Sequence, residues 1–408
     1  MWILLIIYLF ILSFYLSYKL KFKNYKINIK ELILNDKTSL FLTLGTKMGV
    51  GSIIGTISSI LIGGFSSVLW IIIFSLIWTS IVYYESYYGN KYSEKGIGGP
   101  YFIFKNGLNN RYLAIISSIL LIILYSFLFQ MIQFNTMSYI FINTLNISKI
   151  LLVILSSILL FITINLSIIN ILNIMNKVVP YMCIIFICIS LYVVIINFNN
   201  INITVLLKDL LSFKSIMCGL VIGIKRSIFM NEILVGTTSV GAASDKNDIN
   251  ISTKYQILCV FFISIVITLL ITFLLLIYLN NNIIYGTDYN LILVEIFNSL
   301  LGKFGIYFLL IIYILFGFTT VLSGYYIGSS LIKYIFNNKI IINLFKIIFI
   351  VSCIIGIIYK NEIIWKYTDI LIFIMIIINS YSIIKLVIKD DRKWLGWNIK
   401  TSMGKCWI

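Results

Sequence analysis

The sequence predicts an all-α integral membrane protein of about 11 transmembrane helices. The chain has 408 residues, of which 61% are hydrophobic and 11% are charged, a composition far from that of soluble domains. Apolar runs of about 20 residues recur along it, and each can cross roughly 30 Å of hydrocarbon as a helix. Stretches such as 115–129 and 263–279 are apolar on nearly every face, whereas the strands of a membrane barrel would alternate.

The apolar runs place the expected helices in order along the chain. The first, at 2–20, has the length of a signal peptide, but it lacks a basic start and a small-residue cleavage site, so we expect a retained helix. No soluble domain interrupts the series. The expected spans lie near 2–20, 40–62, 65–90, 111–142, 149–170, 178–198, 214–244, 254–280, 304–336, 340–359 and 362–388.

The net charge of +17 arises mainly from short loops between the apolar runs, where basic residues act as topology signals. We therefore expect no nucleic-acid partner and a multi-pass protein in the lipid bilayer of the cell membrane. The first connection is rich in lysine, which places it in the cytoplasm and the N-terminus outside. The C-terminal tail then also lies in the cytoplasm. The lysines of the first connection are Lys19, Lys21, Lys23, Lys26, Lys30 and Lys37.

The sequence lacks histidine and any cluster of residues that would indicate common enzyme chemistry. There is no histidine, and the six cysteines show no CxxC or other metal-ligand spacing, which argues against a zinc site or histidine-based catalysis. A membrane-embedded transferase would need an acidic or histidine cluster in an interfacial loop, and none is visible. We expect no enzymatic activity, no cofactor and no bound metal other than a transported cation.

Two of the expected helices are interrupted by polar residues. Residues 45–52 (GTKMGVGS) put a lysine and three glycines into an apolar run, and residues 225–232 (KRSIFMNE) followed by 236–239 (GTTS) do the same further on. Such segments are tolerated at membrane depth only against protein or a water-filled cavity. Without the first helix, these are the first and sixth of ten helices. That placement predicts two five-helix inverted repeats whose broken helices meet at the midplane and bind substrate and ions.

Seven motifs in order over roughly residues 40–330 resemble those of the alanine or glycine:cation symporter family, which has the LeuT-type fold. They are GVGSIIG at 49–55, GG at 63–64 with Trp70, Glu85 and Tyr92, GGPY at 98–101 with KNGL at 105–108, QFN at 133–135, KVVPYM at 177–182, GIKRSIFMNE at 223–232, and FTT at 318–320 with YY at 325–326.

The resemblance implies a sodium-coupled transporter of a small neutral amino acid such as alanine or glycine, working by alternating access in a bacterial inner membrane. It also implies a domain division. Residues 1–39 would form an extra helix and a cytoplasmic basic loop, residues 40–388 a LeuT-type transport core, and residues 389–408 a basic cytoplasmic tail.

The chain departs from the family pattern at several of these positions. Ser52 stands where the family has asparagine, and Ile233-Leu234 replace Ala-Gly after the glutamate. Lys47 lies inside the ion-binding stretch of the first interrupted helix and is a candidate surrogate for one sodium ion. A proton-coupled or uncoupled transporter, or an amino-acid receptor that does not transport, therefore remains an alternative.

The candidate substrate-binding residues lie on the two interruptions and on one further helix. Unwound backbone at the first interruption would bind the substrate carboxylate and a cation, and the alternative is a small-residue helix contact. Neighbouring Lys225 and Arg226 are either a buried pair for the glutamate or anchors at the cytoplasmic side. The candidates are Gly49, Gly51, Ser52, Gln133, Asn231 and Glu232.

Oxygen atoms opposite the first interruption would complete a shell for a hard monovalent cation. The hydroxyl groups among them could instead bond to helical carbonyls, as is common in membrane helices. Glu85 is an acid in an apolar helix, so it is a candidate for coupling, although a structural partnership with a basic residue is the stronger reading. The candidate cation-binding residues are Gly45, Thr46, Met48, Thr319, Thr320 and Ser323.

Overall fold

The computed structural model describes residues 2–20, 29–281, 288–359 and 361–403. Within these ranges the regular secondary structure is helical, apart from one isolated bridge between Glu94 and Ile97. Eight of the described helices are long and apolar enough to cross a membrane, and a bent pair makes nine. Two further predicted spans fall on a helix of 17 residues and on a helix interrupted by polar residues, so the predicted count of 11 stays a prediction.

The helices agree with most of the predicted spans. In chain order the first half consists of α1 (Trp2–Lys19), α2 (Ile29–Leu34), α3 (Thr38–Lys47), α4 (Val50–Gly63), α5 (Ser66–Lys91), α6 (Pro100–Phe102), the π-helix η2 (Ile103–Gly107), α7 (Arg111–Ile122), the π-helix η3 (Ile123–Leu128), α8 (Phe129–Leu145), α9 (Lys149–Asn165) and α10 (Ile168–Ile196).

The second half begins with a short 3-10 turn, η4 (Phe198–Asn200). It continues with α11 (Ile203–Leu211), α12 (Phe213–Asn231), α13 (Thr237–Ala242), α14 (Ile249–Phe261), the π-helix η5 (Phe262–Ile267), α15 (Thr268–Asn281), α16 (Ile292–Phe336), α17 (Lys339–Ile358) and α18 (Asn361–Met403).

Two boundaries differ from the prediction for identifiable reasons. α10 begins ten residues earlier than expected and carries Pro180 inside it, which membrane helices tolerate when neighbours satisfy the freed backbone groups. α16 begins at Ile292 because an additional helical segment precedes the predicted span at 304–336. Gly302 separates the two parts with φ 62° and ψ −150°, a conformation that suits glycine because it has no Cβ.

The first predicted interruption is present as a sharp bend. α3 and α4 meet at 53°, with Met48 and Gly49 between them. Gly49 is extended, at φ −79° and ψ 165°, and a Cβ there would lie 2.2 Å from the side-chain nitrogen of Gln133. A glycine is therefore needed at this point so that the Gln133 amide can pack against the break.

The second interruption separates α12 from α13 over residues 232–236. Glu232 and Leu234 have φ values of 51° and 59°, and Gly236 has φ 108°. Left-handed conformations are uncommon for residues other than glycine, and they persist where the surroundings fix them. Both helices that were predicted to be interrupted are thus broken in the structure.

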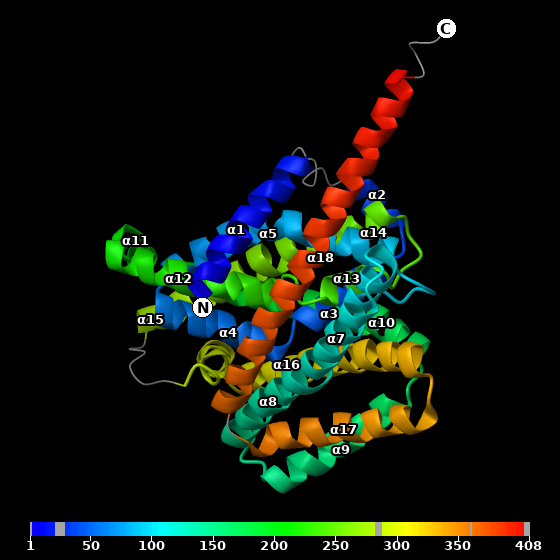
Figure 1. The fold of residues 1–408 in the computed structure, drawn as a ribbon. Helices are drawn as coiled ribbons and strands as arrows, with labels where there is room; N and C mark the ends of the chain where they lie inside the picture. Colours follow the sequence, from blue (N-terminus) through cyan, green and yellow to red (C-terminus); the bar gives the residue numbers. More distant parts are fainter. Residues whose placement is uncertain (1, 21–28, 282–287, 360, 404–408) are drawn as a thin grey trace.

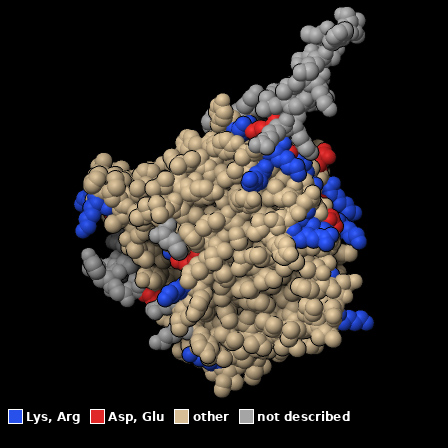
Figure 2. Space-filling view, in the orientation of Figure 1, with Lys and Arg blue, Asp and Glu red and all other residues tan. Residues whose placement is uncertain are grey.

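α1 lies on the outside of the molecule beside α18, and both helices run toward the same end (Figure 1). The Tyr8 hydroxyl donates to Ser380 Oγ at 2.8 Å, and Lys19 Nζ lies 2.6 Å from Asp391 Oδ2. The charged side chains visible in Figure 2 gather mainly around this end, while the middle of the molecule shows a broad uncharged surface. An uncharged band of this kind is what a helix bundle presents to lipid.

Glycines of α12 allow close packing against α5. A Cβ on Gly223 would lie 2.7 Å from the Ser67 carbonyl oxygen and 2.8 Å from Trp70 Cβ. Small residues let helix backbones approach in this way in membranes. This contact fixes the middle of α12 against α5, and with it the position of the break that follows Asn231.

We expect Gly223→Leu to lower the thermal unfolding midpoint of the purified protein in detergent. The added side chain meets backbone that cannot yield, and overpacking of this kind costs about 1–3 kcal/mol. Val221→Leu, two residues away on the exposed side of the same helix, is the matched control and should change stability by no more than about 0.5 kcal/mol. Equal midpoints for the two variants would contradict the tight α5–α12 contact.

Candidate functional site

The two broken helices meet in the middle of the bundle. Lys47, the last residue of α3, reaches α13, where its Nζ donates to Thr238 Oγ1 at 3.3 Å. Arg226 of α12 donates from its guanidinium to the carbonyl oxygen of Ser52 in the first turn of α4. α16 joins them, because Thr320 Oγ1 lies 3.1 Å from the Gly45 carbonyl oxygen. Residues that are far apart in the sequence thus converge on the first break.

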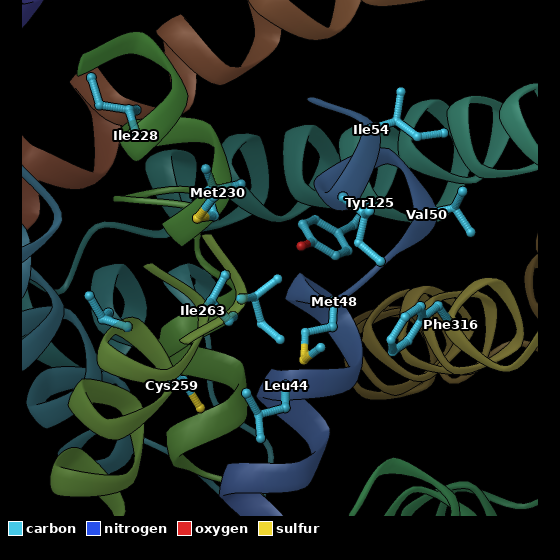
Figure 3. Packing of buried hydrophobic residues seen from close by; sticks show 14 of the residues in the cluster. Leu44, Met48, Val50, Ile54, Tyr125, Ile228, Met230, Cys259, Ile263 and Phe316 are labelled. Atoms are coloured by element: carbon cyan, nitrogen blue, oxygen red, sulfur yellow. The ribbon is translucent and has the colours of Figure 1, made fainter. Parts of the chain in front are cut away.

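A small cavity lies at this junction. Its volume is about 30 Å³, which is enough for at least one water molecule. Figure 3 shows buried apolar side chains of this region, with Met48 in the turn between α3 and α4, Val50 at the start of α4 and Tyr125 beside them. The cavity is lined by Thr46, Gly51, Ser52, Tyr125, Phe129, Ile132, Gln133, Arg226, Phe229, Glu232, Thr320 and Trp365.

Four of the six predicted substrate-binding residues line the cavity, namely Gly51, Ser52, Gln133 and Glu232. The Gly51 N–H points at Gln133 Oε1 from 3.5 Å, at the long limit of a hydrogen bond. Ser52 donates its hydroxyl to the Lys47 carbonyl oxygen at 2.6 Å, so this side chain closes the break locally. Gly49 is in close contact with the Gln133 amide.

Asn231 lies away from the cavity. Its amide donates to Ser75 Oγ at 2.7 Å and to the Ser227 carbonyl oxygen at 2.9 Å, and it accepts from Ser264 Oγ at 3.1 Å. These bonds tie the end of α12 to α5 and η5. The structure therefore gives Asn231 contacts that hold the break in place.

The predicted cation-binding residues divide into two groups. Thr46 and Thr320 line the cavity, and the Gly45 carbonyl faces Thr320. The hydroxyl groups of Thr319 and Ser323 donate to carbonyl oxygens of their own helix, at 3.1 Å and 2.9 Å, the local bonding named above as the alternative. Thr46 and Thr320 also make such bonds, to the carbonyl oxygens of Thr43 at 2.6 Å and Phe316 at 2.9 Å, and differ from the other two in that they line the cavity.

Met48 directs its side chain elsewhere. Its sulfur accepts from Cys183 Sγ at 3.5 Å, and the residue belongs to the main apolar cluster. Only its main chain is thus available at the turn between α3 and α4.

Glu85 stabilises the second break through the backbone. Its two carboxylate oxygens accept hydrogen bonds from Leu234 N at 3.0 Å and Gly236 N at 2.9 Å. The residue is 1% exposed, and these N–H groups have no helical partner because the chain is unwound there. Sequence reasoning favoured a basic residue as the partner of Glu85, whereas the described hydrogen bonds come from the backbone of the break and Lys47 acts on Glu85 only as a nearby charge.

Lys47 is buried between acidic groups. It is 1% exposed, and its charge acts on both Glu85 and Glu232, while its hydrogen bond goes to Thr238. Glu232 in turn accepts from Thr237 Oγ1 at 2.6 Å. The ammonium group thus lies between the two broken helices, beside the cavity and not on its lining.

Sequence reasoning missed several residues of the lining. Arg226 had been left between two readings, and the aromatic residues Tyr125, Phe129, Phe229 and Trp365 were not among the candidates. Tyr125 belongs to the π-helix η3, and π-helical turns are frequent at functional sites. A single sequence does not reveal a π-turn, so Tyr125 carried no signal, and the other three aromatic residues lie in ordinary α-helices where nothing in the sequence marks them.

At the end where α1 and α18 finish, a polar cluster ties the loops together. The Glu94 carboxylate accepts from Tyr334, from Asn106 at 2.8 Å and from Lys105 at 3.3 Å. The hydrogen bond from Tyr334 is the largest cause that lowers the pKa of Glu94 below its usual value. The cluster links the loop before α6 to the end of α16.

We expect Glu85→Ala to lower the thermal unfolding midpoint strongly, because it leaves two buried N–H groups without an acceptor. Each such group costs about 1–3 kcal/mol. Glu295→Ala is the control, since that half-buried carboxylate accepts one hydrogen bond within the described residues, from the Tyr278 hydroxyl. A Glu85→Ala midpoint no lower than that of the control would mean that the break does not depend on this carboxylate.

The chain is similar in sequence to a known family of transporters. The sequence pattern of the sodium:alanine symporter family matches residues 1–398. The amino-acid carrier protein AlsT of Bacillus subtilis (strain 168) is 25% identical over 353 residues, which cover 84% of this chain and 75% of AlsT. The probable sodium/glutamine symporter GlnT of the same organism is 22% identical over 409 residues, covering 94% and 85% of the two chains.

Two further matches are a sequence relative and a solved structure. An uncharacterized transporter of Haemophilus influenzae is 25% identical over 366 residues, covering 84% and 75% of the two chains. Among solved structures, the Eremococcus coleocola manganese transporter overlaps with 88% of this chain and 75% of its own, at 12% identity and a TM-score of 0.41. The family match spans nearly the whole sequence and confirms the resemblance seen in the motifs, so the chain belongs to the sodium:alanine symporter family.

Proposed function

We propose that this protein is a secondary transporter that carries a small neutral amino acid, such as alanine or glycine, together with sodium. The observation that carries the proposal is the cavity at the junction of the two broken helices, where Arg226 and Glu232 both contribute to the lining. A zwitterion needs one cationic and one anionic partner. Broken helices that meet in mid-bundle are the usual site for substrate and coupling ion in transporters of this kind.

The proposed architecture is a 5+5 inverted-repeat core of the LeuT type over residues 40–388. Residues 1–39 add a helix and a basic loop, and residues 389–408 add a basic tail. We place the protein in the inner membrane of a bacterium as a multi-pass protein. The N-terminus is outside, and the C-terminus is cytoplasmic, because the end formed by α1 and α18 carries lysines such as Lys19, Lys91 and Lys389.

The proposed mechanism needs no covalent chemistry. A cation binds oxygen atoms at the first break, where Thr46, Thr320 and the Gly45 carbonyl come together. The ion then stabilises the geometry of α3 and α4 that the substrate requires. Substrate joins the same cavity, and rocking of one repeat against the other exposes it to the opposite side.

The size of the cavity favours a small side chain. Phe129, Phe229 and Trp365 belong to its lining, and rings of this size leave little room beyond the polar groups. Glutamine, which is named for the relative GlnT, is the larger substrate to compare. The proposal predicts that alanine and glycine compete better than glutamine.

The deciding experiment measures uptake of labelled alanine, glycine and glutamine into proteoliposomes that contain the purified protein. We expect uptake to rise with an inward sodium gradient and to collapse when choline replaces sodium at equal concentration. Binding of an amino acid without any flux would favour a receptor. Uptake driven by a proton gradient and indifferent to sodium would replace sodium coupling with proton coupling.

Lys47 is proposed to supply a fixed positive charge in place of a second cation. Its ammonium acts on Glu85 and Glu232 from inside the first break. We expect Lys47→Ala to make uptake more steeply dependent on sodium, with a Hill coefficient higher by about one. The measurement is initial uptake against sodium concentration.

Thr238→Ala is the matched control for this substitution. It removes the hydrogen-bond acceptor of Lys47 and leaves the charge in place, so the sodium dependence should keep its original shape. A Lys47→Ala curve with an unchanged Hill coefficient, from protein that is folded and active, would rule out the surrogate role.

A further inference from the structure

We propose that the guanidinium of Arg226 binds the substrate carboxylate, so that the transporter accepts only amino acids with a free carboxylate group. The inference rests on the proposed transport function and adds a residue that determines specificity. The neighbouring Lys225 is paired with Asp369, so substitutions of the two residues are expected to have different effects on binding.

Arg226 is a buried cation with few partners. It is 9% exposed, and its one described hydrogen bond goes to the Ser52 carbonyl oxygen. Its Nε is buried without a hydrogen-bond partner, and within the described ranges none of the ion pairs includes it. A charge buried in this way is unfavourable unless it is paired, so the site is suited to an anion.

Lys225, on the same helix, is a basic residue that has an ion-pair partner. Its Nζ lies 2.8 Å from Asp369 Oδ2 and 5.0 Å from the ring centre of Trp2. Its side chain is 42% exposed, and it does not line the cavity. Two consecutive basic residues therefore face different surroundings, and only the second contributes to the cavity.

The first two turns of α4 leave room for the guanidinium. A Cβ on Gly55 would lie 2.2 Å from Arg226 Nη1, so the absence of a side chain at this position makes room for the charge. Gly51 and Ser52, at the start of the same helix, line the cavity beside it. Helix starts favour negative charge, and the planar guanidinium can bind both oxygens of a carboxylate.

Glu232 gives the second half of the recognition. It lines the cavity together with Arg226, and among the described ion pairs none includes this carboxylate. Besides Thr237, its neighbours are Lys47 at the end of α3 and Tyr125 of η3. An α-amino acid would place its carboxylate at Arg226 and its ammonium toward Glu232, which fixes the orientation of the substrate.

The test compares binding of L-alanine with that of L-alaninamide, which keeps the ammonium and lacks the carboxylate. Binding to the purified full-length protein in sodium is measured by competition with labelled alanine. We expect the unmodified protein to prefer alanine strongly. Arg226→Gln should weaken alanine binding about 10- to 100-fold, the loss expected for one charged hydrogen-bonding group, and should leave alaninamide binding nearly unchanged.

Two further variants make the result decisive. Lys225→Gln removes the neighbouring charge and should keep the affinity for alanine and the preference over alaninamide. Gly55→Ala retains Arg226 and all charges but displaces the guanidinium, so it should weaken alanine binding and reduce the preference. This variant also tests the proposal if Arg226→Gln fails to fold.

Each outcome bears on a definite claim. If Arg226→Gln or Gly55→Ala keeps the original affinity and preference while sodium-driven uptake persists, the role of Arg226 is overturned and the transport function stands. If the unmodified protein neither binds nor transports alanine, glycine or glutamine in sodium, the proposed function fails, and the inference falls with it. If Lys225→Gln shows the same loss as Arg226→Gln, the effect is one of general charge and contradicts the assignment.

Discussion

The structure depends on satisfying the backbone of a helix that is interrupted at membrane depth. Neither lipid nor bulk water can take over the hydrogen bonds that such a break releases. In the second break Glu85 accepts from two N–H groups, and Asn379 of α18 donates to the Leu234 carbonyl oxygen at 2.7 Å. The surrounding helices thus hold the break open, which keeps Glu232 at the cavity and not inside a continuous helix.

The charges at the centre form a balanced group around the two breaks. Lys47 and Arg226 carry positive charge, and Glu85 and Glu232 carry negative charge when ionised. Within the described residues they form no direct ion pairs with one another. Glu85 instead accepts hydrogen bonds from backbone N–H groups, and Lys47 donates to the Thr238 hydroxyl. Charges that are near but unpaired can be redistributed when a zwitterion and a cation enter.

Sequence reasoning found the two breaks because glycine and charge in apolar runs have a direct physical cost. It also found Gln133 and Glu232 at the cavity, by resemblance to a family. It assigned Asn231 to the substrate, whereas the structure turns its amide to Ser75 and Ser264, which come from distant helices. It left Arg226 undecided, since the partner that distinguishes Lys225 is Asp369, far along the chain. Contacts of that range are set by packing, which a single sequence does not display.

The charged end of the bundle bears on how ionic conditions should be interpreted. α18 is fastened there by Lys91 and Asp390 at 3.1 Å and by Lys19 and Asp391 at 2.6 Å, all partly exposed. Screening by dissolved ions weakens such pairs, with a Debye length of about 10 Å at 0.1 M. Under the proposed function, sodium acts on this protein in two ways, as the coupling ion and as a general electrolyte. Only comparisons at constant ionic strength separate the two, and a loosened α18 would otherwise imitate an effect of the coupling ion.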